Sequence, residues 1–438
     1  MKEIKLRTGI WYNDRAITLS FPDSWEVVTY WPNTPPPLTD EDISKIADSP
    51  IGQPPLYELA KGKKNPLIVV DDLARPTPTY RIVPLLLHHL ERAGITSSRV
   101  RILVATGTHG EQNESALANK LGKAGIESCN VIVHNDMCNT KYIGRTSFGT
   151  PVFANKELLS SDLIIGISGV YPQHTTGFGG GSKLSLGVLG RKSIIHLHYG
   201  HEAVGGNYDI NNGFRRDVTE IARMIKLNTI YTIHVNAHLE IVNLMCGDHF
   251  SYYPRAAQFS LEKYAAPLPD EADVVIANAY PFDLSFTFMR KAYKPLDYAP
   301  QKATKIMVAS NSEGIGVHGL FQHIKPSRFI RYRSMYRRIS LMEPRVILSK
   351  LINRLKFRKE LQSNEHKAAP NYAMPRNTNH LWVYRPNCED LRTPAIDGMT
   401  TTDAWKNILE AIEKEQSHGN AIKVRIYPCA PLQCLVRN

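Results

Sequence analysis

The sequence predicts an α/β protein built from two mixed α/β domains, with the active site in the cleft between them. Short apolar runs that end in turn residues alternate with segments of helical periodicity, which is typical of a parallel or mixed sheet covered by helices. The alternation occurs on both sides of Pro267–Ala272, a stretch that reads as a linker. The length of 438 residues also favours more than one domain. We therefore expect an N-terminal catalytic and cofactor-binding domain over residues 1–268 and a C-terminal domain over 269–438.

The first predicted domain contains most of the recognisable elements. Its apolar runs predict strands at Pro66–Asp72, Val100–Ala105, Val131–His134 and Asp162–Val170, and its periodic segments predict helices at Tyr80–Ala93, Asn113–Ala124 and Arg216–Ile225. Residues 1–60 read as short strands and proline-rich loops. The second predicted domain has strands at Val274–Asn278 and Ile306–Ala309, and alternation predicts a last, half-buried strand at Lys423–Tyr427.

The composition is that of a globular protein, with 42% hydrophobic and 21% charged residues. No apolar run approaches the roughly 18 residues of a membrane span, and the N-terminus lacks the apolar region of a signal peptide. The six cysteines include no C-x-x-C pair, which argues against a zinc site or a disulfide framework. We expect reduced thiols and a cytoplasmic location.

Most of the net charge of +12 comes from one segment. Residues 325–359 hold twelve Lys and Arg against the single acid Glu343, so we expect a basic insert at about 325–360. A helical insert with a solvated face is the favoured interpretation. A surface that binds nucleic acid or a membrane is less favoured, and attraction of an anionic substrate is a third alternative.

A cluster of candidate functional residues follows the strand at Asp162–Val170. Ten residues there contain His174, a glycine run and Lys183. Glycines allow a backbone to approach a ligand closely, and His and Lys supply a base, a metal ligand or a nucleophile. The spacing fits neither the P-loop nor the Rossmann pattern. A glycine-rich turn with a surface lysine remains the alternative. Three further histidines follow at 196, 198 and 201.

Two other predicted strands also end in polar loops. The first loop holds Asp71, Asp72 and Arg75; it could bind hydroxyls and a carboxylate or phosphate, or an Asp–Arg ion pair could brace it. The second is Gly107-Thr108-His109-Gly110, whose histidine is either a base or a structural residue. Because all three loops follow strands of one predicted sheet, we expect them to converge at one edge.

These motifs resemble the lactate racemase family, whose members use a nickel pincer nucleotide. The similarity runs over about residues 10–320. It rests on the following motifs: Asp71-Asp72-x-x-Arg75-Pro76-Thr77-Pro78, Gly107-Thr108-His109, His174-x-x-Gly177-Phe178-x-Gly180-Gly181-x-Lys183, Ile194-x-x-x-His198, Pro281-x-Asp283 through Lys291-Ala292, and Asn311-x-Glu313-Gly314-Ile315-Gly316.

The resemblance implies racemisation or epimerisation of a 2-hydroxy acid by reversible hydride transfer. It implies His109 and His174 as the acid/base pair and Lys183 as the covalent attachment point of the cofactor. It implies His198 as the nickel ligand, with His196 or His201 as alternatives because the segment after Lys183 is one residue shorter than usual. The remaining implied roles are cofactor contacts for Asp72, Thr106, Thr108, Gly177, Gly180 and Gly181, and substrate contacts for Arg75, Lys291, Thr287 and Phe288.

Departures from the family pattern bear on the substrate. Gly110 replaces a common arginine, and Thr287-Phe288 replaces a Tyr-Gln pair before Lys291. We therefore expect a 2-hydroxy acid other than lactate, with an aliphatic or aromatic tail. The implied partners are this small acid and the cofactor-synthesis proteins. The alternatives are other hydride chemistry on the same cofactor, or a non-enzymatic protein whose basic segment binds polyanions.

Overall fold

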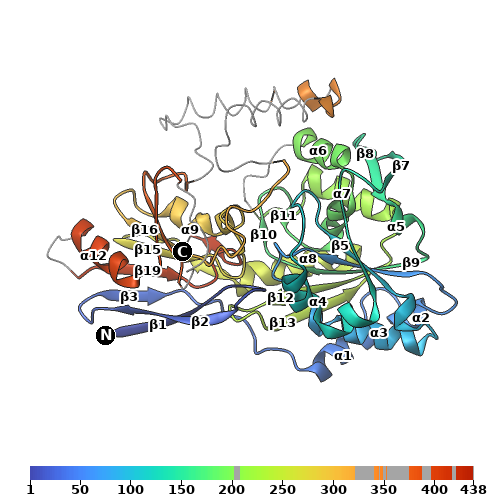
Figure 1. Cartoon of the computed structure of the whole chain (residues 1–438), viewed down its shortest axis with the longest axis horizontal. Coiled ribbons are helices and arrows are strands. Elements are labelled where there is room, and N and C mark those ends of the chain that lie inside the picture. Colours follow the sequence, from blue (N-terminus) through green and yellow to red (C-terminus); the bar gives the residue numbers. More distant parts are fainter. Residues whose placement is uncertain are drawn as a thin grey trace.

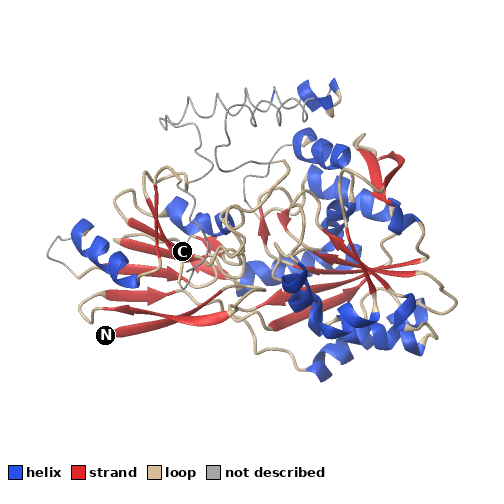
Figure 2. Ribbon diagram, viewed as in Figure 1, coloured by secondary structure: helices blue, strands red, loops and turns tan. Residues whose placement is uncertain are grey.

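The computed structural model describes residues 1–201, 208–320, 374–386, 396–416 and 421–437, together with 340–344, 346–348 and 352. These residues build two six-stranded sheets that lie side by side, with helices packed against each (Figures 1 and 2). The predicted α/β class is confirmed. Most of the basic insert predicted at about 325–360 lies outside the described residues.

The first sheet has the strand order β13-β12-β9-β4-β5-β6. The neighbouring strands are parallel, except that β13 runs antiparallel to β12. Because β9, β4 and β5 are adjacent and parallel, their carboxyl ends share one edge of the sheet. The strands are β4 (Pro66–Asp71), β5 (Arg101–Ala105), β6 (Asn130–Val133), β9 (Leu163–Gly169), β12 (Thr229–Val235) and β13 (Ile241–Gly247).

Both faces of the first sheet are buried, as expected for parallel strands with continuous apolar runs. Ile68 and Val70 of β4 pack into one core, and the alternate residues Leu67 and Val69 pack into another. Full burial of each such side chain contributes about 1.5–3 kcal/mol. The first core contains α3 (Val83–Arg92) and α4 (Glu114–Ser128), and the second contains α6 (Arg191–Gly200), α7 (Gly213–Met224) and α8 (His249–Lys263).

The second sheet is parallel throughout, in the order β18-β17-β16-β15-β19-β3. The hairpin β1–β2 and helix α12 contribute to the core on one face, and α9 contributes to the core on the other. The elements are β1 (Lys2–Thr8), β2 (Arg15–Phe21), β3 (Glu26–Thr29), β15 (Val274–Asn278), α9 (Tyr293–Tyr298), β16 (Thr304–Val308), β17 (Leu381–Tyr384), β18 (Met399–Thr402), α12 (Trp405–Glu415) and β19 (Lys423–Tyr427).

The ends of the chain differ from the predicted elements. The strand predicted at Lys423–Tyr427 is confirmed, with Val424 and Ile426 buried and Lys423 and Arg425 partly exposed. It is not the last strand, because it lies between β15 and β3, and β20 (Cys434–Val436) follows it. β20 pairs with β14 (Ala265–Pro267), at the start of the predicted linker. Since β3 pairs with β19 in the second sheet, the chain contributes to the second sheet before it enters the first sheet at β4, and the domain division at residue 268 stays a prediction.

Helix α1 (Asp40–Asp48) lies in a region predicted to hold only short strands and loops. A capping box begins this helix: the Thr39 hydroxyl accepts a hydrogen bond from the Asp42 amide, and the Asp42 carboxylate accepts one from the Thr39 amide. The smaller elements include α2 (Leu56–Leu59), β7 (Thr140–Arg145), β8 (Pro151–Asn155) and α5 (Lys156–Leu159). None of the described helices is long and apolar enough to span a membrane.

Candidate active site

The three polar loops singled out in the sequence converge at the carboxyl edge of the first sheet. The strand register pairs Asp71 at the end of β4 with Ala105 at the end of β5. On the other side β4 pairs with β9, which leads into the glycine-rich loop. Ligands of α/β proteins bind at this edge. The adjacency predicted for the loops is therefore confirmed.

The two acids after β4 have different partners. Asp71 pairs with the buried Lys120 of α4 (Nζ–Oδ1 2.9 Å) and accepts a hydrogen bond from the Thr77 hydroxyl at 2.5 Å. Lys120 also donates to the carbonyl of Arg75 at 2.8 Å, so it fixes the loop that carries Asp72 and Arg75. Among the described ion pairs, none joins either acid to Arg75, so the suggested Asp–Arg brace is replaced by the Asp71–Lys120 pair. No pattern in the sequence pointed to Lys120.

Asp72 orients His109. Its Oδ2 lies 2.5 Å from Nδ1 of His109, and the carboxylate is almost fully buried. A carboxylate accepts hydrogen bonds, so Nδ1 carries the proton and Nε2 of the neutral ring is the nitrogen that can take one up. Burial lowers the pKa of His109, although the charge of Asp72 acts in the opposite direction. The pKa of Asp72 is also lowered: burial raises it, but the interactions with His109, Arg75 and Lys120 together outweigh burial.

Two aromatic rings contact the His109 imidazole. The centroid of Phe288 lies 5.0 Å away at an interplanar angle of 77°, and that of His318 lies 5.0 Å away at 64°. The neighbouring Thr287 uses its hydroxyl to donate to the carbonyl of Ile315 at 2.7 Å. His318 was missed in the sequence, although Gly316-Val317-His318-Gly319 repeats the Gly-x-His-Gly pattern that marked His109.

The predicted substrate cations, Arg75 and Lys291, share the ring of Tyr171. The Arg75 guanidinium carbon lies 5.6 Å from the ring centroid and Nζ of Lys291 lies 5.5 Å from it. Lys291 belongs to the short helix η4 (Met289–Ala292) of the second predicted domain. Burial, followed by the positive charge of Arg75, lowers the pKa of Lys291 well below its ordinary value. The structure therefore brings together two cations that are far apart in the sequence.

Lys183 lies in the short helix η3 (Gly181–Val188), and its Nζ is 5.7 Å from the centroid of Phe214. Burial, followed by the charges of Arg75 and Arg215, lowers the pKa of Lys183 to about 7. At neutral pH a large share of this amine is therefore unprotonated and nucleophilic.

His174 lies close enough to Lys183 and Lys291 for their charges to affect its pKa. Part of its side chain remains exposed, while the protein around the ring, and then the charges of Lys291 and Lys183, lower its pKa. The charge of Arg290 contributes to the same effect. His174 is thus favoured in the neutral form that a base requires.

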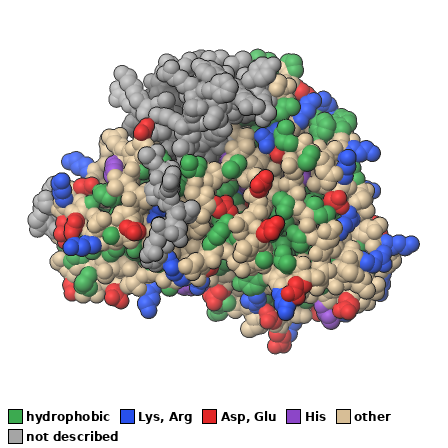
Figure 3. Space-filling model, viewed as in Figure 1, with side chains coloured by type: hydrophobic (Ala, Val, Ile, Leu, Met, Phe, Trp, Pro, Cys, Tyr) green, Lys and Arg blue, Asp and Glu red, His purple; other side chains and the backbone are tan. Residues whose placement is uncertain are grey.

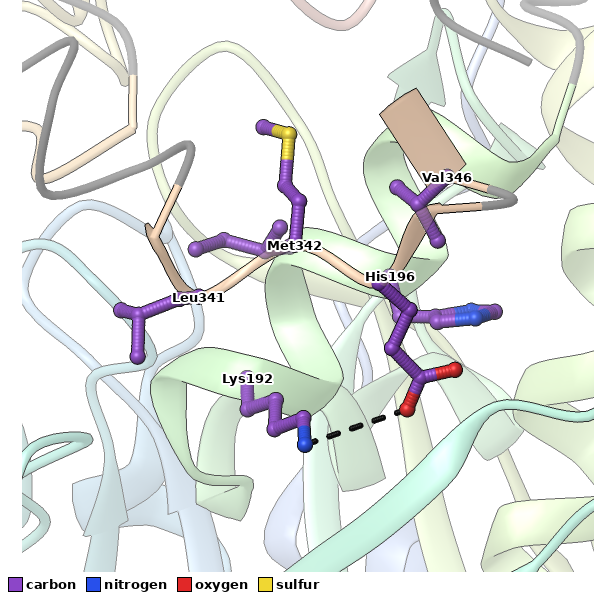
Figure 4. Close-up of a pocket in the computed structure, with 7 residues that line it drawn as sticks. Lys192, His196, Leu341, Met342 and Val346 are labelled. Carbon is purple, nitrogen blue, oxygen red and sulfur yellow. Dashed lines mark ion pairs between the residues drawn. The ribbon is translucent and has the colours of Figure 1, made fainter. Parts of the chain in front are cut away.

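The histidine cluster of α6 separates into two environments. His201 Nε2 donates to the buried carboxylate of Asp217 at 2.7 Å. The Thr150 hydroxyl donates to the same carboxylate at 2.5 Å and lies 3.1 Å from Nδ1 of His196. His196 also lines a small pocket between α6 and the segment 341–346, where Lys192 pairs with Glu343 at 3.8 Å (Figure 4). These contacts engage both alternative nickel ligands in a network of their own.

His198 lies on the Lys183 side of the cluster. Its Nδ1 donates to the carbonyl of Ile194 at 2.8 Å, so Nε2 is the unprotonated nitrogen of the neutral ring. Its ring packs edge-on against Phe214 at 5.3 Å, the ring that Lys183 also approaches. Burial, followed by the charge of Lys183, lowers the pKa of His198 to about 3. Among the described residues, no group of three or more His, Cys, Asp or Glu side chains could hold a metal ion.

The predicted cofactor-contacting glycines are tightly enclosed by protein. All three have positive φ, and an added Cβ would lie 2.3 Å from the Asp209 carbonyl at Gly177, 2.8 Å from the Gly169 carbonyl at Gly180 and 2.4 Å from the Tyr253 ring at Gly181. The loop therefore requires glycine for its own packing. Contact of these glycines with a cofactor stays a prediction.

A buried arginine holds the glycine-rich loop in place, and sequence reasoning missed it. Arg215 of α7 donates to the carbonyls of Phe178 and Gly180 and to the hydroxyl of Tyr253. Tyr253 of α8 in turn donates to the Gly179 carbonyl at 2.5 Å. An arginine near a helix start reads as a surface charge, so only the packing of α7 and α8 on the loop reveals this role.

The two threonines predicted to line the cofactor lie on the loop after β5. The Thr106 hydroxyl donates to the carbonyl of His134 at 2.6 Å, which holds the loop to the end of β6. The Thr108 hydroxyl lies 3.5 Å from Nδ1 of His318. Thr106 therefore has a structural contact, and Thr108 faces the His109 side of the site.

The fold and this site define a class of protein: an α/β enzyme with two neutral histidines, a nucleophilic lysine and several buried cations at the carboxyl edge of one sheet. Comparison with known proteins agrees. A family model described as the lactate racemase N-terminal domain matches residues 12–205. The lactate racemase of Lactiplantibacillus plantarum is 30% identical over 295 residues, covering 65% of this chain and 69% of that protein. The lactate racemase of Thermoanaerobacterium thermosaccharolyticum is 28% identical over 302 residues, covering 66% and 70%.

Solved structures show the same fold. The lactate racemase apoprotein from Thermoanaerobacterium thermosaccharolyticum aligns with a TM-score of 0.65 at 21% identity, covering 99% of this chain and 100% of that one. A protein from Thermotoga maritima aligns with a TM-score of 0.57 at 15% identity, covering 92% and 100%. The chain belongs to the lactate racemase family. This membership assigns it an isomerase activity of the racemase or epimerase type.

Proposed function

We propose that this chain racemises or epimerises a 2-hydroxy acid other than lactate with a nickel pincer nucleotide attached to Lys183. When bound, this cofactor supplies a reversible acceptor for the hydride of the substrate α-carbon. The observation that carries the proposal is the convergence of His109, His174, Lys183 and His198 at one sheet edge, each with a lowered pKa.

The protein's own part is proton transfer and orientation. His109 presents Nε2 because Asp72 holds Nδ1, and it takes the hydroxyl proton of one enantiomer. His174 serves the other enantiomer, whose hydroxyl lies on the opposite side. Each histidine starts neutral at pH 7 and, once protonated, returns its proton readily because the surrounding protein and, at His174, the charges of Lys291 and Lys183 disfavour the charged ring.

The positive charge of the site favours anionic ligands. Arg75 and Lys291, which share the Tyr171 ring, would hold the substrate carboxylate. Burial and the charge of Arg75 disfavour the protonated form of Lys291, and a carboxylate placed between the two side chains would favour it again.

The residues around Lys183 fit the implied cofactor. Lys183 supplies a partly unprotonated amine for attachment, and His198 supplies a single imidazole of the kind that suits nickel. Both approach the Phe214 ring, so one aromatic residue would support both contacts.

The wall beside His109 supports a substrate with an apolar tail. Phe288 contributes an aromatic ring there, and the Thr287 hydroxyl is engaged with the Ile315 carbonyl. An aliphatic or aromatic group would pack against Phe288 better than a methyl group, which removes less apolar surface from water.

The experiment supplies the protein with a single enantiomer of each acid and analyses the products by chiral chromatography. The acids are lactate and a set of longer aliphatic, aromatic and dicarboxylic 2-hydroxy acids. The loaded protein should convert the aliphatic or aromatic acids fastest, and Lys183→Ala should convert none. A fastest conversion of lactate would overturn the substrate assignment. Loaded protein that racemises no acid would favour the alternative of other hydride chemistry on the same cofactor.

A further inference from the structure

The segment Asn311–Leu320 bridges the two halves of the site. At one end, the amides of Phe286 and Thr287 donate to the carbonyls of Gly314 and Ile315 at 2.9 and 3.0 Å. At the other end, the amide of Gly319 donates to the carbonyl of Thr108 at 2.7 Å. The loop is thus tied both to the segment that carries Phe288 and to the loop that carries His109.

Two glycines allow the segment Asn311–Leu320 to lie close to its neighbours. Gly316 has φ +73°, and an added Cβ would lie 2.1 Å from the Ser285 hydroxyl oxygen. Gly110 has φ +86°, and an added Cβ would lie 3.3 Å from Val317. Side chains at these two positions would therefore push the bridging segment away from the site.

The bridge holds the His318 ring in a defined state. Its Nδ1 accepts a hydrogen bond from the amide of Leu320 at 3.3 Å and lies 3.5 Å from the Thr108 hydroxyl. Because an amide only donates, Nδ1 is unprotonated and the neutral ring carries its proton on Nε2. The ring then packs edge-on against His109 at 5.0 Å.

We propose that His318 is a positioning residue for His109, an inference that rests on the proposed function. The Asp72 contact fixes Nδ1 of His109 but leaves rotation of the ring about that contact. The rings of Phe288 and His318 restrict this rotation, so Nε2 keeps one direction toward the substrate. His318 acts through the packing of its ring, and its Nδ1 contact with Leu320 sets only its tautomer.

Three variants separate the ring from its hydrogen bond. His318→Phe keeps a ring without the Nδ1 acceptor, His318→Asn keeps an acceptor without the ring, and His318→Ala removes both. His238→Asn is the matched control, because His238 stacks on Trp31 at 6.1 Å and belongs to none of the site loops. The first readout is long-range ¹H–¹⁵N spectroscopy of ¹⁵N-histidine protein without cofactor, with the His109 signals assigned by their loss in His109→Gln.

We expect one set of ring signals for His109, protonated at Nδ1, in the wild type, His318→Phe and His238→Asn. His318→Asn and His318→Ala should give broadened or averaged signals. In loaded protein these two variants should lose about tenfold in kcat with KM changed less than about twofold. Unchanged His109 signals in both variants, or disturbance by His318→Phe alone, would overturn the proposal. The spectra need neither cofactor nor turnover, so they distinguish this failure from a failure of the proposed function.

Discussion

At the level of single residues, Lys183 shows how far an environment can shift a side chain from its ordinary chemistry. Burial and two neighbouring guanidinium groups act in the same direction on its pKa. The sequence motif predicted which lysine matters. It could not predict the protonation state, because Arg215 comes from a helix 32 positions further along the chain.

We expect Lys183 to react with a small acylating reagent as a neutral amine. In protein without cofactor, competitive labelling with acetic anhydride should reach half of its maximal rate near pH 7, because the pKa is about 7. Free Nα-acetyl-lysine in the same solution is the internal reference and should titrate near pH 10.4. A Lys183 curve that follows the reference would contradict the proposed environment.

Asp72 provides a second test at this scale. Asp72→Asn should lower kcat by about 10²-fold, since an amide can donate to Nδ1 as well as accept from it and therefore no longer fixes the tautomer of His109. The loss of the carboxylate charge should also lower the pKa of His109 further, which shifts the acidic limb of the pH–rate profile to lower pH. Steady-state kinetics across pH measure both effects. An unchanged kcat would mean that the Asp72–His109 contact has no part in turnover.

At the level of elements, α7 and α8 control the loop that carries Lys183. Hydrophobic periodicity predicted α7, which begins at Gly213 and not at Arg216, whereas no helix was predicted where α8 lies. The contacts of Arg215 and Tyr253 with the loop carbonyls could not be predicted, because they depend on how the two helices pack on a turn. The same holds for Lys120, whose partner Asp71 lies on another element.

Arg215→Met should loosen this loop. The carbonyls of Phe178 and Gly180 would lose a buried donor, which costs about 1–3 kcal/mol of unfolding free energy. Removal of the positive charge should also raise the pKa of Lys183 and shift its labelling curve to higher pH. Arg216→Met is the matched control, since Arg216 bonds the exposed Asn211. Equal stability and equal Lys183 labelling in both variants would show that the Arg215 hydrogen bonds do not hold the loop.

At the level of the whole molecule, parallel strands with continuous apolar runs predicted the fold class and the edge that carries the site. The pairing of β3 and β19 in the second sheet was beyond the sequence, because it joins residues nearly 400 positions apart. Most of the positively charged segment 325–359 lies outside the described residues. On the face shown in Figure 3, basic and acidic side chains of the described residues are interspersed.

Global stability should fall on mild acidification because buried histidines stay neutral in the folded chain. His234 donates from Nε2 to the Ala256 carbonyl at 2.8 Å, and burial lowers its pKa to about 4. The unfolded histidine takes up a proton near pH 6.5, so protons stabilise only the unfolded state as the pH falls from 6.5 toward 4. The contribution is fully present above pH 6.5.

Urea unfolding of the wild type and His234→Gln at pH 7 and pH 5 measures this contribution. The difference in unfolding free energy between the two proteins should change by about 2 kcal/mol between these pH values, in the direction that favours the variant at pH 5. A difference that does not depend on pH would show that His234 is protonated in the folded protein as readily as in the unfolded one.

The central claim is that Lys183 anchors the cofactor of a 2-hydroxy acid racemase. The most direct test is the intact mass and nickel content of the chain after expression with the cofactor-synthesis proteins. The account predicts an added mass on the Lys183 peptide together with bound nickel, retained in His109→Gln and lost in Lys183→Ala. A wild-type chain of unmodified mass under these conditions, or an adduct that persists in Lys183→Ala, would contradict it.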